Sequence, residues 1–284
     1  MNAPVLTDAS TAFLPIYAED AFTLARQGGS GALMYPPADA RLEPAWTVRA
    51  VITASDVVLG KGLLTLGSGC VFYGWVLEST EFPGEFAIDI RGTISLPEWL
   101  KDAEFAPRPH PVVGQVEQGF WSIYATMGIN GTVGHVADDL AKLLKDATSV
   151  TVTGHSLGAA LALLLSFDLA APERLGRRVQ PVVFASPRPG DGAFGKALLQ
   201  RAPTHRAYAY ELDVVPRVPF GFAFESVPGT VELSMFHPGT HVEFSLACNH
   251  HALTYATLID RTAFARFSPI GVDQPFLNCI SLAA

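Results

Sequence analysis

The most informative stretch of this chain is residues 150–160, which read VTVTGHSLGAA. The β-branched residues at its start are typical of a buried strand, and the Leu- and Ala-rich run that continues past its end is typical of a helix. Between them stands G-x-S-x-G, which holds Ser156 on a strained strand-to-helix bend with its Oγ clear of the sheet. Gly154 and Gly158 suit that bend, because the two backbones pass too close together for a Cβ. The stretch therefore predicts a nucleophilic serine, and the alternative is an ordinary strand–helix turn.

The rest of the chain alternates strand-like and helix-like segments. Two apolar segments at 70–78 and 85–90 flank a Pro-Gly turn, which predicts a hairpin or two adjacent strands. The remaining expected strands are at 150–153, 181–186 and 205–211, and the expected helices are at 18–25, 135–146, 193–201 and 252–259. This alternation predicts an α/β fold with a mostly parallel, doubly wound sheet. Such sheets place their chemistry at the carboxyl ends of the strands, where Ser156 falls.

Composition narrows the classes of function. The 284 residues suffice for one large α/β domain, and 49% of them are apolar. Charged residues make up 16% and the net charge is −8 without a basic block, which argues against nucleic-acid binding and leans towards an apolar substrate or interface. Cys70, Cys248 and Cys279 show no metal-ligand spacing, so we expect no metal and no cofactor. Cys248 and Cys279 could pair, but we expect buried free thiols.

Neither a secretory leader nor a membrane span is expected. The first 25 residues contain no Lys or Arg, so they lack the basic start of a signal peptide. The longest apolar stretch, 157–167, is too short to cross a bilayer. We therefore expect a cytoplasmic protein by default, and export by a signal-independent route stays open. The sequence does not indicate an oligomeric state.

A serine nucleophile needs a histidine base, and that histidine needs an acid to orient it. On this kind of fold the chain order is Ser, acid, His, so the acid should follow a later strand. Asp213, just after the strand at 205–211, fits best. Asp191, in a Pro/Gly-rich turn, is the rival, and Glu211 is a weaker one.

The base is expected at a loop-to-helix junction late in the chain. His250 and His251 stand at the head of the helix expected at 252–259. Spacing alone does not choose between them. His155 is next to the nucleophile and cannot fold back to serve it.

The tetrahedral intermediate needs two donors for its oxyanion. One is the main-chain N–H of Leu157, directly after the nucleophile, and the other should come from the loop after an earlier strand. Thr93 supplies it in the segment IDIRGT at 88–93, where Gly92 lets the chain turn and Arg91 could brace the loop. The alternative for Thr93 is a simple turn residue.

At this point the chain resembles the class 3 (fungal-type) triacylglycerol lipase family, over roughly residues 70–260. The segments that carry the resemblance are FAIDIRGT at 86–93, VEQGF at 116–120, TGHSLG at 153–158, FASPRPG at 184–190 and DVVPR at 213–217. The resemblance implies an α/β-hydrolase fold, with a mostly parallel central sheet flanked by helices, and a triad of Ser156, Asp213 and His250. The family's histidine is often followed five residues later by a tyrosine, here Tyr255, which selects His250 over the alternative base His251.

The segment LPEWLKD at 96–102 is similar to the family's lid. Apolar Leu96, Trp99 and Leu100 alternate there with charged residues, so a lid-like segment at about 94–106 could cover an apolar groove and open on a lipid surface. The alternative is a surface helix that packs its tryptophan permanently. Residues 1–68 match no recognisable pattern, and we expect them to pack as an N-terminal extension on a single domain spanning 1–284.

These observations predict a serine carboxylester hydrolase that acts on lipid esters at a lipid–water interface through an acyl-enzyme. A phospholipase A1 or a short-chain esterase is the alternative among enzymes, and a catalytically silent lipase-like binding module is the alternative outside them. Every triad position is filled, which favours an enzyme. Four phenylalanines are candidate groove walls but are expected to be core residues: Phe220, Phe222, Phe224 and Phe236.

Overall fold

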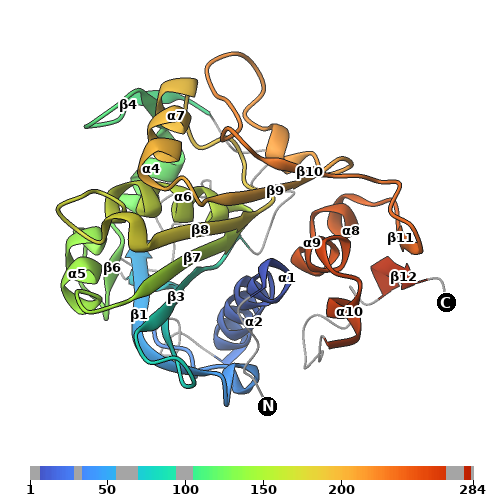
Figure 1. Cartoon of the computed structure of the whole chain (residues 1–284), viewed down its shortest axis with the longest axis horizontal. Coiled ribbons are helices and arrows are strands. Elements are labelled where there is room, and N and C mark those ends of the chain that lie inside the picture. The colour runs from blue at the N-terminus through green and yellow to red at the C-terminus, as the bar shows by residue number, and fades with distance from the viewer. Residues whose placement is uncertain (1–6, 29–33, 56–69, 94–104, 267–277, 283–284) are drawn as a thin grey trace.

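A mixed β-sheet runs through the centre of the molecule (Figure 1). The computed structural model describes residues 7–28, 34–55, 70–93, 105–266 and 278–282. Within these ranges, eight strands form the sheet in the order β10-β9-β8-β7-β3-β2-β1-β6. Their bounds are β1 Trp46–Ser55, β2 Cys70–Ser79, β3 Glu85–Ile90, β6 Gly128–Ile129, β7 Ser149–His155, β8 Val179–Phe184, β9 Arg206–Tyr210 and β10 Val231–Leu233.

The strands around the nucleophile are parallel. β3, β7, β8, β9 and β10 pair in parallel, whereas β2 pairs antiparallel with β3 and with β1, and β6 pairs antiparallel with β1. The turn at 82–85 joins β2 and β3, as the sequence predicts. In register, Ile90 lies opposite Gly154, and His155 lies opposite Phe184. The carboxyl ends of β3, β7 and β8 therefore meet at one edge of the sheet.

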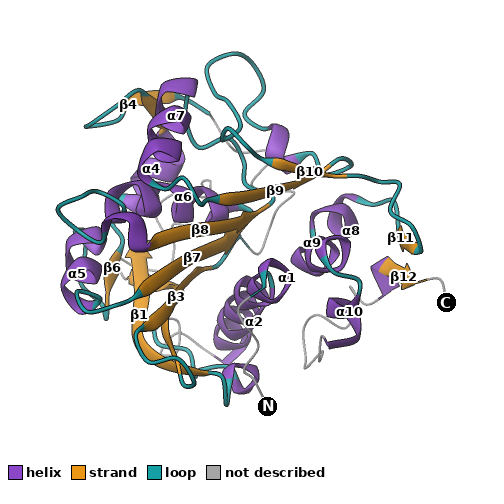
Figure 2. Ribbon diagram, viewed as in Figure 1, coloured by secondary structure: helices purple, strands orange, loops and turns teal. Residues whose placement is uncertain are grey.

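Helices cover both faces of the sheet, and the bounds of the main ones are α1 Asp8–Thr11, α2 Phe13–Gly28, α4 Gln118–Tyr124, α5 Val136–Leu143, α6 Leu157–Leu169, α7 Gly192–Arg201, α8 Leu246–His250, α9 Ala252–Ile259 and α10 Thr262–Arg266. Figure 2 shows α4 to α7 on one side of the sheet and α1, α2, α8 and α9 on the other. α6 contacts β3, β7 and β8, and α4, α5 and α7 pack around it. Because it is apolar all round, this helix is suited to the centre of the core. The structure thus confirms the α/β fold with a mostly parallel sheet flanked by helices.

The first 68 residues contribute more than a covering layer. β1 is an integral strand of the sheet, paired with β2 along its length. α2 contacts β2, β3 and β7, and α1 and α2 both contact α9 near the other end of the chain. The two ends of the sequence thus build the same helical layer, and this layer lies over the strands that carry the nucleophile.

Two small two-stranded sheets lie outside the central sheet in the described part of the chain. β4 (Pro107–Pro109) pairs with β5 (Gln115–Glu117), and β11 (Thr240–Val242) pairs with β12 (Ile280–Leu282). A disulfide joins Cys248 of α8 to Cys279 beside β12. The expectation of buried free thiols is therefore wrong for these two cysteines, because the pairing of β11 with β12 brings distant parts of the chain together. Cys70 is a free cysteine.

Candidate active site

Ser156 occupies the strand-to-helix bend between β7 and α6. Its φ of 57° and ψ of −129° are strained for a residue with a side chain. The flanking glycines show why the bend is so tight. A Cβ on Gly158 would lie 2.2 Å from the main-chain oxygen of Ile90, and a Cβ on Gly154 would lie 2.4 Å from that of Gly158. Both glycines are therefore needed for close backbone contact, as the motif predicts.

The loop after β3 runs directly beside the bend. A Cβ on Gly92 would come within 3.3 Å of Ser156 Cβ and 3.0 Å of the His155 oxygen. Arg91 braces this loop, because its buried guanidinium donates to the main-chain oxygens of Phe72 and Gly92 at 2.7 and 2.8 Å. Thr93 follows at the half-buried end of the described segment. The structure thus places the predicted oxyanion loop next to the predicted nucleophile.

Leu157, the other predicted oxyanion donor, is the first residue of α6. The first N–H groups of a helix have no acceptor within that helix. Its main-chain N–H is therefore suited to bind an oxygen that carries developing negative charge.

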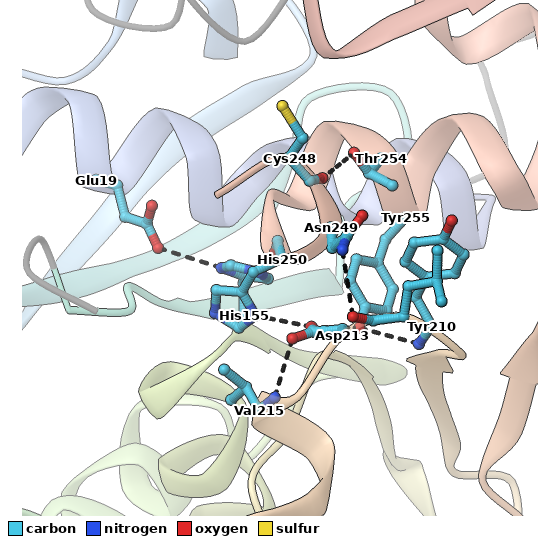
Figure 3. A network of polar contacts seen from close by, with 11 residues as sticks. Glu19, His155, Tyr210, Asp213, Val215, Cys248, Asn249, His250, Thr254 and Tyr255 are labelled. Carbon is cyan, nitrogen blue, oxygen red and sulfur yellow. Dashed lines mark hydrogen bonds and ion pairs between the residues drawn. The ribbon is translucent and has the colours of Figure 1, made fainter. Parts of the chain in front are cut away.

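His250 and Asp213 form a buried pair at the same edge of the sheet (Figure 3). His250 Nδ1 lies 2.7 Å from Asp213 Oδ2. His250 ends α8, whereas Asp213 follows β9, so two distant segments supply the pair. Asn249 ties them together by donating from its side chain to the Leu212 oxygen at 3.3 Å.

Three donors surround the Asp213 carboxylate. In addition to the His250 ring, the Tyr255 hydroxyl donates to Oδ2 at 2.7 Å and the Val215 N–H donates to Oδ1 at 2.9 Å. The Tyr255 oxygen in turn accepts from the main-chain N–H of Tyr210 at 3.0 Å. Asp213 is 1% exposed, so these donors replace the water that its charge would otherwise require.

Ser156 Oγ and His250 Nε2 are both buried atoms without a hydrogen-bond partner among the described residues. The structure does not join them to each other by a hydrogen bond. Contacts of this kind are often long in unliganded enzymes and tighten when substrate binds. Both atoms are therefore available to a reacting group.

Burial favours the neutral form of the His250 ring. It lowers the pKa of His250 against the attraction of Asp213, and the charge of the neighbouring His155 ring lowers it further. The two rings lie close, with centroids 4.5 Å apart. A neutral imidazole can accept a proton at Nε2 while its Nδ1–H donates to Asp213.

The rival residues have other roles. Asp191 caps α7 by accepting from Phe194 N at 2.8 Å, and Glu211 accepts from Met235 N at 3.0 Å. His251 accepts from Leu253 N at 3.2 Å and so caps the N-terminus of α9. The structure thus brings His250 and Asp213 together and places all three rivals in caps or loop contacts.

Two residues contact the candidate site although the sequence assigns them no role in it. Tyr255 serves on sequence grounds as a marker of spacing, although its hydroxyl contacts Asp213. Glu19 of α2 is not among the expected site residues, although its carboxylate lies 3.6 Å from His155 Nδ1. The sequence holds one signal, because Glu19 stands in an expected helix among the apolar residues Ala18, Ala21 and Phe22, where an acidic side chain usually has a partner.

Several predicted features fall elsewhere. Leu96, Trp99 and Leu100, and with them most of the expected lid, lie outside the described residues. Phe224 is a core residue as expected, but Phe220, Phe222 and Phe236 are exposed, so the expectation is wrong for these three. Phe220 and Phe222 lie between β9 and β10, and Phe236 lies between β10 and β11, so all three belong to connecting segments and not to the packed strands.

The described residues were also compared with the requirements of a metal site and of a membrane-spanning helix. In this part of the chain, no group of three or more His, Cys, Asp or Glu side chains is arranged to hold a metal ion. No helix within the same ranges has the length and apolarity needed to cross a bilayer.

The sheet topology and the serine at the strand-to-helix bend define the α/β-hydrolase class. Solved structures agree with this fold. The triacylglyceride lipase of Rhizomucor miehei superposes with a TM-score of 0.58 at 19% identity, covering 78% of each chain. A lipase from Rhizopus microsporus var. chinensis gives a TM-score of 0.55 at 23% identity, covering 81% of this chain and 75% of the other.

Within that class, the chain belongs to the class 3 lipase family, whose model matches residues 87–223. Among curated relatives, phospholipase A1-II 7 of Oryza sativa subsp. indica is 31% identical over 226 residues, or 66% of this chain and 51% of the relative. The lipase of Rhizomucor miehei is 34% identical over 142 residues, or 48% of this chain and 38% of the relative. The chain thus spans about half or less of the length of these relatives.

Proposed function

We propose that this protein hydrolyses carboxylic esters of lipids through an acyl-enzyme on Ser156. The observation that carries the proposal is the buried pair of His250 Nδ1 and Asp213 Oδ2, 2.7 Å apart, at the sheet edge that presents Ser156. Membership of the class 3 lipase family supports the same chemistry.

The residues divide the reaction as follows. His250 Nε2 accepts the Ser156 hydroxyl proton as Oγ attacks the ester carbon, and the Asp213 carboxylate holds the ring in the required tautomer. The main-chain N–H groups of Thr93 and Leu157 bind the resulting oxyanion, and each such donor is worth about 10²–10³ in rate. His250 then donates the proton to the departing alcohol. Water, deprotonated by the same ring, attacks the acyl-enzyme and releases the acid.

Replacing the nucleophile tests this assignment. We expect Ser156→Ala to abolish hydrolysis of a p-nitrophenyl ester while circular dichroism and thermal unfolding show a retained fold. Turnover equal to that of the wild type would overturn the role of Ser156. Absence of turnover in the wild type, together with binding of lipid, would favour the binding module over the enzyme.

The second part of the proposal concerns which class of lipid ester is hydrolysed. A triacylglycerol substrate is favoured by the solved lipase structures, whereas a phospholipid is favoured by curated relatives named phospholipase A1 from rice and from Arabidopsis thaliana. We propose triacylglycerol as the substrate and a phospholipid cleaved at its sn-1 ester as the alternative.

Paired substrates separate these two possibilities. Trioleoylglycerol and a phosphatidylcholine labelled differently in its two acyl chains are presented in mixed micelles of equal composition. Faster release from trioleoylglycerol is the expected result. Preferential release of the sn-1 chain of the phospholipid would instead identify a phospholipase A1. A series of p-nitrophenyl esters of increasing length then defines the acyl preference and tests the short-chain esterase.

A further inference from the structure

A carboxylate from the N-terminal helix reaches the back of the candidate site. Glu19 of α2 accepts a hydrogen bond from Gly92 N through Oε1, at 3.0 Å. The same oxygen lies 3.6 Å from His155 Nδ1, a distance for an ion pair rather than a hydrogen bond (Figure 3). A Cβ on Gly92 would come within 2.6 Å of this oxygen, so the glycine permits the contact. One carboxylate thus holds the oxyanion loop and faces the histidine beside the nucleophile.

The other nitrogen of the same ring faces the base. His155 Nε2 lies 2.6 Å from the main-chain oxygen of His250. Both neighbours of the ring, the Glu19 carboxylate and this carbonyl, can only accept. A neutral imidazole has one N–H and would leave one of these oxygens facing a lone pair. The imidazolium, with a proton on each nitrogen, satisfies both contacts.

The surroundings support this charge state. Burial acts to lower the pKa of His155, but contact with Glu19 raises it above its ordinary value. For Glu19, burial acts to raise the pKa, but the His155 ring, His251 and the Gly92 N–H lower it. The carboxylate and the ring therefore each stabilise the charged form of the other.

We propose that Glu19 and a cationic His155 form a partly buried ion pair that positions His250 and the oxyanion loop together. The contacts run in an unbroken series from Gly92 N to Glu19, from Glu19 to the ring, and from the ring to the His250 carbonyl. Glu19 and His155 are then positioning residues, because they contact the main chain of Gly92 and of His250 and not the substrate. Their effect on turnover rests on the proposed function, whereas the charge state of the ring does not.

The pair gives activity a defined dependence on pH. Its titratable neighbours are Asp89 on β3, Asp213 after β9, His250 at the end of α8, His251 between α8 and α9, and Tyr255 on α9. The ring is cationic below its raised pKa and becomes neutral as pH rises through it. Turnover should therefore fall on the alkaline side as His155 loses its proton. In Glu19→Gln the ring lacks its counter-charge, so this fall should move to lower pH.

Two variants on the same helix make a matched comparison. Glu19→Gln keeps the size of the side chain and an oxygen for Gly92 N but removes the charge. Asp20→Asn removes the neighbouring buried carboxylate, whose Oδ2 pairs with Arg41 Nη2 at 2.6 Å on another side of α2. Asp20→Asn should lower the unfolding temperature and leave the pH profile unchanged, which isolates any merely structural effect of altering α2.

The charge of the ring is measured first, by ¹⁵N NMR of histidine-labelled protein, with His155→Gln to assign the signals. At pH 7.5 we expect both His155 nitrogens to be protonated in the wild type and in Asp20→Asn, and one of them in Glu19→Gln. A neutral His155 in the wild type would overturn the ion pair. This measurement needs no turnover and holds even where ester hydrolysis is not found.

Kinetics test the positioning role. Glu19→Gln should lower kcat about tenfold or more and leave KM within about twofold, because the pair acts on groups that bind the transition state. Its alkaline limb should lie at lower pH than that of the wild type. A profile identical in shape to the wild type, merely scaled down, would overturn positioning by the charged pair. Labelling of Ser156 by a fluorophosphonate in the same samples shows independently whether the proposed function holds.

Discussion

Single side chains at the sheet edge show how burial is made compatible with charge. The Asp213 carboxylate is almost fully enclosed, yet His250, Tyr255 and the Val215 N–H all donate to it. Such an arrangement offsets the cost of burying a carboxylate, because charge-assisted hydrogen bonds are about twice as strong as neutral ones. It also fixes the His250 ring with Nε2 pointing away from the acid.

The protonation of His250 predicts the acid limb of activity. A base must be neutral, and burial lowers the pKa of His250, so the ring stays neutral below its ordinary pKa of about 6.5. We expect kcat/KM to rise with pH through a midpoint below 6.5 and then to stay level until the alkaline fall set by His155. A pH series on a soluble ester measures it. A midpoint clearly above 6.5 would contradict this electrostatic account.

The positions of the candidate site residues can be predicted from sequence where chain order carries the information. Ser156, Asp213 and His250 each follow or end an element whose position is visible in the pattern of apolar residues. Glu19 could not be found this way, because its partner Gly92 is 73 residues away and α2 has no fixed place relative to β3 without the folded sheet. Whether Thr93, Leu157 and the three triad positions act as proposed remains a prediction.

Elements meet at very short distances around the nucleophile. The first turn of α6 lies against the carboxyl end of β3, and Gly158 allows the two backbones to come into contact. Elsewhere in a helix, replacing glycine by alanine typically stabilises by about 0.5–1 kcal/mol. Here the added Cβ would lie 2.2 and 2.5 Å from the main-chain oxygens of Ile90 and Arg91, neither of which can rotate away.

Gly158→Ala should therefore destabilise the protein, by about 1–3 kcal/mol, the cost of overpacking a close contact. Urea unfolding followed by circular dichroism measures the change. A gain in stability would contradict the close approach of α6 to β3.

The disulfide between α8 and β12 predicts a second effect at this level. The bond closes a loop between two cysteines that are 31 residues apart in sequence. One of them, Cys248, lies two residues before His250. Cys248→Ser with Cys279→Ser should lower the free energy of unfolding by about 3–4 kcal/mol. Cys70→Ser, which alters the free cysteine, is the control and should change stability little. Titration of the unfolded wild type should find one thiol, and three would contradict the bond.

Element prediction fails where a segment depends on its partner. The helix at 252–259 and the turn between β2 and β3 can be predicted, because their own periodicity or turn residues identify them. β1 lies in the N-terminal segment that shows no recognisable pattern, yet it pairs with β2 in the sheet. Its alternation of half-buried and exposed residues at the start is weak by itself, and the pairing that stabilises it comes from a later segment.

At the scale of the whole molecule, helices α1 and α2 near the start of the chain meet α9 near its end, in the layer behind the nucleophile. Asp8 of α1 also pairs with Arg206 of β9. On the outside, Phe220 and Phe222 stand exposed on the loop that follows the acid, with exposed fractions of 73% and 105%. Exposed aromatic side chains of this kind are typical of binding to an apolar surface, and we propose that they contact the lipid phase.

That proposal predicts a difference between dissolved and aggregated substrate. Phe220→Ser with Phe222→Ser should slow hydrolysis of an emulsified ester several-fold, because each lost aromatic side chain weakens adsorption, while hydrolysis of the same ester below its solubility limit is unchanged. Val133→Ser, at another exposed apolar residue, is the control and should alter neither rate. Equal losses on dissolved and emulsified substrate would contradict contact with the lipid phase.

The central claim is that Ser156 is a nucleophile activated by His250 and Asp213, and one measurement tests it directly. The protein is treated with a fluorophosphonate, digested, and analysed by mass spectrometry to locate the adduct. We predict a single adduct on Ser156 that forms in the wild type, is absent in Ser156→Ala and forms far more slowly in Asp213→Asn. No adduct on Ser156 in folded wild-type protein, or equal labelling in Asp213→Asn, would contradict the account.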